Sequence, residues 1–192
     1  MQLDPFDWKV LQYGDPTQRA AYAVIAQTRI FEVLRDHTPA HIGTIGNRLY
    51  RPTSDIDIAC CSDDLRRVET QLVSMYGATY PIKHCKSKRA GKDYLVVQIA
   101  SQIPIEVYCE DTPTELQAGY RHYVITVKLL QMLGEPFREK ILKIRSLGKK
   151  TEPSIVKALG IVTDDPYGEL LKIADLPDAA LTEMVHRVRS EG

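Results

Sequence analysis

The sequence predicts an α/β (α+β) protein: a mixed β-sheet with flanking helices, followed by a C-terminal helical bundle. Before residue 113, short runs rich in β-branched residues alternate with amphipathic helical patterns. After residue 113 only helical patterns remain, and they are separated by glycine and proline. We therefore expect two domains, an α/β core over 1–112 and a helical region over 113–192 packed on that core.

The elements of the first part follow from periodicity and from breaker residues. Apolar residues at helical spacing predict one amphipathic helix that allows a break, and Ser62 can cap a second helix that Gly77 ends. The last two strands are expected to form a tight hairpin at Ser101-Gln102. The predicted elements are a helix over 16–37, strands over 40–43 and 55–61, a helix over 63–77, a strand over 78–85 broken by Pro81, a basic connection over 83–92, and strands over 94–100 and 103–109.

The second part is predicted to consist of short helices, three of which end at a glycine. They cover 114–133, 136–147, 153–159, 166–174 and 178–189. The connections are short, so we expect no long flexible linker.

Composition narrows the class of protein. Among 192 residues, 25 basic side chains balance 25 acidic ones, so no net charge favours a polyanionic partner. No run of roughly 18 apolar residues is present, and the N-terminus lacks a signal-peptide pattern. The sequence therefore predicts a soluble, cytoplasmic protein without a membrane partner, whose four cysteines are reduced.

Three acidic residues stand in otherwise apolar strands. Side chains alternate across a strand, so Asp55 and Asp57 are expected to share one face. Glu106 alternates with buried-type residues in its own strand and would join the pair if the two strands are neighbours. Carboxylates this close need a compensating cation, and three of them can hold one or two Mg²⁺ ions. The alternative is an exposed edge strand or a turn that follows Ser54.

Residues before this strand can bind phosphate. Gly43 has no side chain, so a phosphate can approach its backbone, and Thr44 can donate its hydroxyl and amide. Arg48 and Arg51 lie in the loop that follows and are further candidates for phosphate contacts. The alternative for Gly43 is a simple turn after a strand.

These motifs together resemble the nucleotidyltransferase superfamily related to polymerase β. The family pattern is a hydrophobic residue, Gly and a small residue, then Asp-hydrophobic-Asp-hydrophobic, then an acid between two hydrophobic residues. In this chain it stands as Ile42-Gly43-Thr44, Asp55-Ile56-Asp57-Ile58 and Ile105-Glu106-Val107. Residues 15–174 also resemble an uncharacterised bacterial family described as domain of unknown function 4269, for which no substrate is known.

The resemblance implies roles for these residues. Asp55, Asp57 and Glu106 would be catalytic metal ligands for Mg²⁺ or Mn²⁺, and Glu106 would help to deprotonate the acceptor. Gly43 and Thr44 would hold the phosphates of a nucleoside triphosphate such as ATP. Threonine stands where the family often has serine, and it keeps the hydroxyl.

Several cations outside the motifs are weaker candidates. In the helical part we select Arg121, Lys149 and Lys150 as nucleotide-binding residues, with ordinary surface charge as the alternative. A basic run in the first part would be either a solvated loop or a phosphate or RNA contact. It consists of Lys83, Lys86, Lys88, Arg89 and Lys92.

The expected activity is transfer of a nucleoside monophosphate from a triphosphate to a hydroxyl acceptor. The acceptor could be a small molecule, a protein or an RNA. Two alternatives remain at this stage. One is a non-catalytic module that binds a nucleotide or a partner protein, such as an antitoxin of a toxin-antitoxin pair, and the other is a metal-dependent phosphohydrolase.

Overall fold

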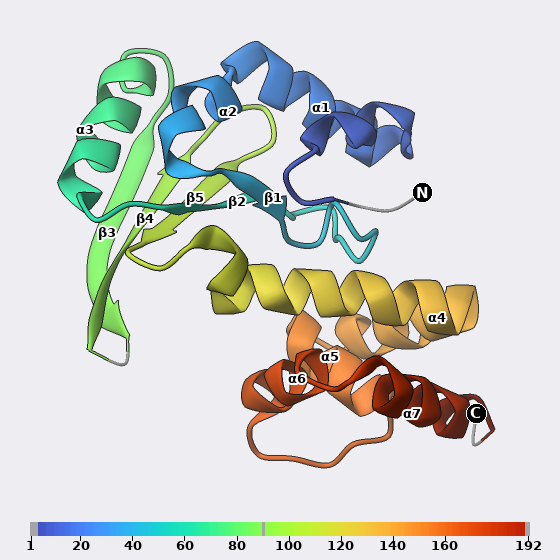
Figure 1. Ribbon diagram of the computed structural model, residues 1–192. Helices are drawn as coiled ribbons and strands as arrows, with labels where there is room; N and C mark the ends of the chain where they lie inside the picture. The colour runs from blue at the N-terminus through green and yellow to red at the C-terminus, as the bar shows by residue number, and fades with distance from the viewer. Residues whose placement is uncertain (1–3, 90, 191–192) are drawn as a thin grey trace. The chain divides into compact units, whose positions relative to one another are not determined.

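A computed structural model describes residues 4–89 and 91–190, except for the side chain of Arg89. The chain divides into two compact units, residues 1–120 and 121–192. The five strands described all lie in the first unit (Figure 1). Within the described ranges, no helix combines the length and apolar character needed to cross a membrane.

The first unit is built from a sheet and short helices. Its helical elements are the 3₁₀ helices η1 (Trp8–Tyr13), η2 (Arg35–His37) and η3 (Thr114–Leu116), and the α-helices α1 (Pro16–Thr28), α2 (Ile30–Val33) and α3 (Leu65–Tyr76). Its strands are β1 (Ala40–Ile42), β2 (Ile56–Cys61), β3 (Ile82–Arg89), β4 (Lys92–Ile99) and β5 (Ile105–Glu110).

The sheet is mixed, with the strand order β1-β2-β5-β4-β3. Only β2 and β5 run parallel among the paired strands described, and the other three pairs are antiparallel. Parallel neighbours need a crossover connection, which α3 and the β3–β4 hairpin provide. Alternate residues of β2, β4 and β5 are buried beneath α1, α2 and α3 on one face (Figure 1). The predicted mixed sheet with flanking helices is confirmed.

The first predicted helix contains the break that its pattern allowed. Arg29 adopts a left-handed conformation, with φ of 56°, between α1 and α2. α1 begins with a capping box, in which Asp15 accepts hydrogen bonds from the amides of Thr17 and Gln18 while the Gln18 side chain accepts from the Asp15 amide. This start of α1 lies beside the candidate site described below.

Two predictions around the hairpins were wrong. Residues 83–92 do not form a basic connection, because β3 runs to Arg89 and pairs with β4 over eight residue pairs. Cross-strand pairing outweighs the weak hydrophobic pattern of this segment. Between β4 and β5 the turn is not tight, since the last pair is Ile99 with Ile105 and the loop between them has five residues.

In the second part, the helices are α4 (Ala118–Ser146), α5 (Thr151–Ala158), α6 (Pro166–Ala174) and α7 (Asp178–Ser190). Gly134 has non-helical backbone angles inside α4, so the predicted division at this residue is confirmed. The prediction of a helix from residue 114 was wrong at its start, because η3 and an extended Gln117 precede α4. The Gln117 amide donates to the carbonyls of Cys60 and Thr112, which holds this segment away from helical geometry.

A buried histidine in β1 predicts acid sensitivity. His41 is 3% exposed, its Nε2 has no hydrogen-bond partner among the described residues, and burial lowers its pKa to about 4. Between pH 6.5 and 4 the unfolded chain takes up a proton that the folded chain does not, so stability falls as the pH is lowered. We expect wild type to lose about 3 kcal/mol of unfolding free energy over this range relative to His41→Leu. Urea unfolding of both proteins at pH 7 and pH 4 measures the difference, and parallel pH profiles would contradict it.

Candidate functional site

The parallel pair of strands brings two of the three predicted acids side by side. Asp57 of β2 lies opposite Glu106 of β5, and on its other side Asp57 pairs with Ile42 of β1. Ile56 and Ile105, the neighbours of the two acids, are fully buried in the core. Because side chains alternate across a strand, Asp57 and Glu106 share the opposite face of the sheet, and both are half-buried there.

Gly43 makes room for the Asp57 carboxylate. Its φ is +82°, and a Cβ added to it would lie 1.9 Å from Oδ2 of Asp57. A side chain at this position therefore cannot coexist with the observed position of Asp57. The glycine of the sequence motif is required both by its backbone angle and by the close approach of the second aspartate.

Asp55 and Glu106, the other two predicted metal ligands, do not form a closed metal site with Asp57. Asp55 is half-buried and stands directly before β2. One oxygen of Glu106 accepts a hydrogen bond of 2.8 Å from Nε2 of Gln98 in β4, and no other hydrogen bond joins this carboxylate to the described residues. Within those residues no three acidic, histidine or cysteine side chains are close enough to hold a metal ion. The donor chemistry nevertheless suits Mg²⁺, which prefers hard carboxylate oxygens.

The loop that carries Gly43 is fastened to the start of α1. The Gln18 side chain is 5% exposed, and its amide donates two hydrogen bonds of 3.0 Å to the carbonyls of Ile45 and Gly46. Ile45 is itself 1% exposed and belongs to the core. Buried hydrogen bonds to backbone carbonyls fix the path of the loop beside β2.

Asp15 provides a second anchor for this loop. Its Oδ2 accepts a hydrogen bond of 2.9 Å from the Tyr50 hydroxyl and lies 3.6 Å from Nε of Arg48. Arg48 has a left-handed backbone, with φ of 62°, and its side chain is about half exposed. The Arg48 guanidinium therefore forms an ion pair with Asp15. A role of Arg48 in phosphate binding stays a prediction.

Thr44 and Arg51 meet at Ser54. The hydroxyls of Thr44 and Ser54 are 3.1 Å apart, and Ser54 Oγ also accepts a hydrogen bond of 3.0 Å from the Arg51 amide. The two ends of the loop are therefore tied together directly before Asp55. The Thr44 hydroxyl, which the sequence predicts to contact phosphate, is thus next to the Ser54 hydroxyl.

The sequence interpretation missed five polar residues around the motif. Asp15 and Gln18 had a visible signal, because an acid followed three residues later by glutamine before an apolar run is a capping box. Nothing in the local sequence marked the other three, whose partners depend on the fold of the loop and on strand register. The five are Asp15, Gln18, Tyr50, Ser54 and Gln98.

The predicted cations of the helical part belong to the second unit. Nη2 of Arg121 lies 2.5 Å from Oδ1 of Asp175 at the end of α6. Lys150 is the N-cap of α5, and its carbonyl accepts a hydrogen bond of 2.7 Å from the Ser154 hydroxyl. Lys149 and Lys150 are exposed. A role of Arg121, Lys149 and Lys150 in nucleotide binding stays a prediction.

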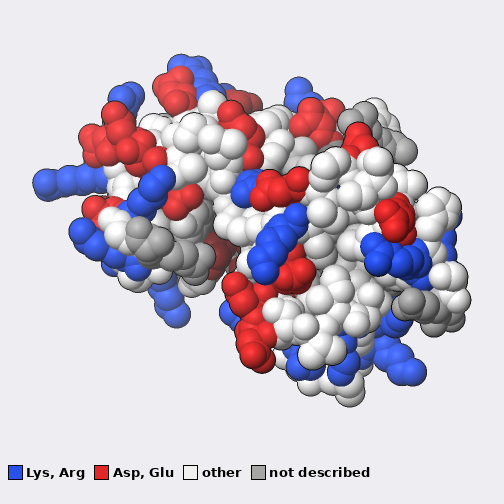
Figure 2. All heavy atoms as spheres, turned by 60° about the horizontal axis from the view of Figure 1, so that its bottom comes forward, with Lys and Arg blue, Asp and Glu red and all other residues white. Residues whose placement is uncertain are grey.

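The basic run on the β3–β4 hairpin has acidic and polar neighbours. Lys86 pairs with Glu69 of α3, Lys88 lies 3.4 Å from Asp93, and Lys92 donates to the Thr112 hydroxyl. The side chain of Arg89 lies outside the described residues. On the face shown in Figure 2, basic and acidic side chains are interspersed. A contact of this hairpin with phosphate or RNA stays a prediction.

Comparison with known proteins places the chain in a family. The family model described as Domain of unknown function (DUF4269) matches residues 23–173, which is most of the chain. The chain belongs to the DUF4269 family. No curated protein matches it.

Solved structures similar to this DUF4269 chain include three of Cid1. Cid1 poly(U) polymerase bound to MgGTP is 13% identical with a TM-score of 0.53, and the match covers 88% of this chain and 53% of that one. A Cid1 mutant bound to MgATP has 12% identity, a TM-score of 0.53 and coverage of 88% and 53%. Cid1 with the UTP analogue UMPNPP has 12% identity, a TM-score of 0.51 and coverage of 88% and 52%.

The likeness to Cid1 establishes the fold. The DUF4269 chain has the fold of polymerase β-like nucleotidyltransferases, as its motifs predicted. The chain spans about half the length of these structures.

Proposed function

We propose that this DUF4269 protein is a nucleotidyltransferase, dependent on Mg²⁺ or Mn²⁺, that transfers a nucleoside monophosphate from a triphosphate to a hydroxyl acceptor. One observation carries the proposal: Asp57 and Glu106 stand side by side on parallel strands, and the Gly43 backbone lies directly against Asp57. The fold and the magnesium nucleotides named for the Cid1 structures support it. The acceptor is a small molecule, a protein or an RNA.

Each residue of the motif has a role in this proposal. Asp55, Asp57 and Glu106 would hold the divalent cation, and the bound cation would neutralise the charge that develops on the phosphates. Gly43 leaves the backbone open to the triphosphate, and the Thr44 hydroxyl and amide would donate to its oxygens. The hydrogen bonds from Gln18 to the carbonyls of Ile45 and Gly46 would hold the Thr44 donors in position before the nucleotide binds.

The reaction is an in-line displacement at the α-phosphorus. The acceptor oxygen forms a new bond to this phosphorus, the bond to the bridging oxygen of the β-phosphate breaks, and pyrophosphate leaves. The proton of the acceptor hydroxyl passes to a carboxylate, for which Glu106 is the candidate. Gln98 donates a hydrogen bond to one oxygen of Glu106, so the other oxygen is the one available for this proton.

Nucleotide binding tests the carboxylate assignment. We expect each labelled triphosphate that binds wild type to need Mg²⁺ or Mn²⁺, and the variant Asp55→Asn/Asp57→Asn to bind at least about 10-fold more weakly, because it loses two metal ligands. Equilibrium dialysis with and without metal measures this. The surface control is Asp164→Asn/Glu183→Gln, which removes two negative charges from exposed positions and should bind as wild type does.

Four outcomes would contradict the proposal. Equal binding by wild type and by the aspartate variant would remove Asp55 and Asp57 from the site. Release of inorganic phosphate without an acceptor would indicate a phosphohydrolase. Metal-independent nucleotide binding without turnover, or co-purification with a partner that blocks binding, would favour a non-catalytic module.

A further inference from the structure

One face of the sheet is accessible over β4 and β5. Helices α1, α2 and α3 cover the opposite face, where alternate residues of β2, β4 and β5 are buried. On the face that carries Glu106, the segment after β5 lies close to β1, because a Cβ added to Gly119 would lie 3.2 Å from Cδ1 of Ile42. Over β4 and β5 every residue of this face is half-buried or exposed. We call this part of the sheet the open face.

Two tyrosines stack on the open face. Tyr94 of β4 and Tyr108 of β5 are diagonal neighbours, because Tyr94 pairs with Glu110 and Tyr108 pairs with Val96. Their ring centroids lie 5.5 Å apart, with an angle of 26° between the ring planes. Both residues are half-buried. Accessible aromatic rings of this kind can bind a second ring or a cation.

The stacked pair continues directly from the proposed active site. Glu106 precedes Tyr108 by two residues on the same strand and shares its face, so the two residues are about 7 Å apart. On the other side of Tyr108, the tyrosine hydroxyl donates a hydrogen bond of 3.0 Å to Oε2 of Glu110. Along β5, Tyr108 therefore has a carboxylate on each side.

The charge beside the tyrosines is negative. Residues 94–98 of β4 and 105–110 of β5 include two glutamates but no lysine or arginine. A divalent cation in the proposed active site would neutralise part of the charge of Glu106, whereas Glu110 lies outside that site. A negatively charged group of a substrate is therefore repelled from the rings, and a positively charged group is attracted.

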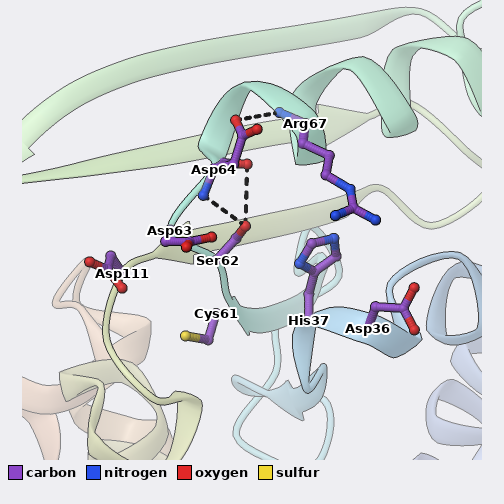
Figure 3. Close-up of a pocket in the computed structure, with 8 residues that line it drawn as sticks. All are labelled: Asp36, His37, Cys61, Ser62, Asp63, Asp64, Arg67 and Asp111. Carbon is purple, nitrogen blue, oxygen red and sulfur yellow. Dashed lines mark hydrogen bonds between the residues drawn. The ribbon is translucent and has the colours of Figure 1, made fainter.

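The negative charge continues past the ends of the strands. Cys61, which pairs with Glu110, borders a hollow of about 610 Å³ at the carboxyl ends of β2 and β5. In this hollow Asp63 and Asp111 lie on the side of Cys61, and the Arg67 guanidinium lies on the other side (Figure 3). Burial, together with nearby acids such as Asp111, raises the pKa of the Cys61 thiol.

Two lysines lie at the margins of the open face. Lys83 belongs to the edge strand β3, and Lys92, two residues before Tyr94, donates to a threonine hydroxyl beyond β5. Neither lysine is next to Tyr108, whose partners on both adjacent strands are uncharged. A phosphodiester backbone along this face would lack basic partners at the rings, which disfavours RNA as the acceptor.

We propose that the acceptor is a small hydroxylated amine, with its ammonium group over the ring of Tyr108 beside Glu110 and its reacting hydroxyl at Glu106. The assignment rests on the proposed function, because it names the acceptor class of that site. The ring attracts the cation, and the Glu110 carboxylate accepts a hydrogen bond from it. An amine and a hydroxyl about 7 Å apart match the spacing of Tyr108 and Glu106. The hydroxyl oxygen bonds to the α-phosphorus, pyrophosphate leaves, and the ammonium group is unchanged.

Transfer of label from an α-labelled nucleoside triphosphate to paired acceptors tests this proposal. Each pair consists of an amine and its neutral counterpart: glucosamine with glucose, 2-deoxystreptamine with inositol, and serinol with glycerol. A short RNA oligonucleotide is the polyanionic acceptor. At pH 7 with Mg²⁺ or Mn²⁺, we expect at least one amine to be labelled with a kcat/KM at least about 10-fold higher than that of its neutral counterpart, and no labelling of the RNA.

Variants of the open face separate acceptor binding from nucleotide binding. Tyr108→Leu and Glu110→Gln should each raise the KM for the amine at least about 5-fold with a smaller effect on kcat, and both should keep metal-dependent nucleotide binding. The matched controls are Tyr13→Leu and Glu183→Gln, which change an exposed tyrosine and an exposed glutamate elsewhere and should leave the KM as in wild type. Thermal unfolding of each variant checks that the fold is kept.

Failure of this proposal differs from failure of the proposed function. If wild type binds nucleotide with metal but labels no amine better than its neutral counterpart, or labels the RNA, the acceptor is not a hydroxylated amine, while the proposed metal site is kept. Equal changes of KM in the open-face variants and in their controls would remove Tyr108 and Glu110 from acceptor binding. If wild type binds no nucleotide with either metal, the proposed function is wrong and the acceptor assignment is wrong with it.

Discussion

Replacing Gly43 with alanine is expected to lower nucleotide transfer about 100-fold or more. The added Cβ would lie 1.9 Å from Oδ2 of Asp57, so the carboxylate or the loop has to move. A displacement of about 1 Å in a catalytic group is enough to cost about 100-fold in rate. Measurement of turnover in the presence of Mg²⁺, with metal-dependent nucleotide binding as a second readout, tests this expectation.

Gly91 provides a matched control for this substitution. Its φ is also +82°, but a Cβ added to it meets no described atom within 4 Å. Gly91→Ala therefore carries the same backbone strain, on the order of 1–3 kcal/mol, without the clash at Asp57. If both variants lose the same amount of transfer activity, the loss is caused by backbone strain and not by the clash with Asp57. If Gly43→Ala keeps normal transfer activity, Asp57 has no role in the reaction.

The fold could be predicted because its determinants are local. Alternation of apolar residues identified β2 and β5, and helical spacing with terminal glycine identified α3 and the division at Gly134. The strand predicted over 78–85 covers only the first half of β3. The second half of β3, over 86–89, could not be found in this way, because its residues follow no apolar pattern and it is specified by pairing with β4. The failure near residue 114 has a similar cause, since the Gln117 side chain donates to the carbonyl of Cys60, which is remote in sequence.

The candidate site could be predicted only where strand geometry determines it. Alternation predicted that Asp55 and Asp57 share one face, which stays a prediction because Asp55 precedes β2. The condition that the two strands are neighbours is met, since Asp57 pairs with Glu106. Part of the support around these acids depends on contacts between residues far apart in the sequence, such as Gln18 with Ile45 and Tyr50 with Asp15. The hydrogen bond between Gln98 and Glu106 joins residues that are closer in the sequence. It depends on the register of β4 with β5, which the sequence does not specify. Such contacts leave no periodic signal.

The anchoring role of Gln18 has a large predicted effect on stability. Its side chain serves three backbone groups, because it donates to the carbonyls of Ile45 and Gly46 and accepts from the Asp15 amide. Substitution with alanine leaves all three without this partner in a site that is 5% exposed. An unsatisfied buried backbone group costs roughly 1–3 kcal/mol, and partial rescue by water lowers the sum.

We therefore expect Gln18→Ala to lower the free energy of unfolding by about 4 kcal/mol in urea denaturation at pH 7. Gln27→Ala is the matched control, since Gln27 lies on the same helix α1 and is exposed, and it should change stability by less than about 0.5 kcal/mol. If the folded variant needs a much higher nucleotide concentration for saturation but keeps its turnover at saturation, Gln18 positions the loop around Gly43 for the proposed nucleotide binding. Equal stability of the two variants would show that the loop around Gly43 holds its path without Gln18.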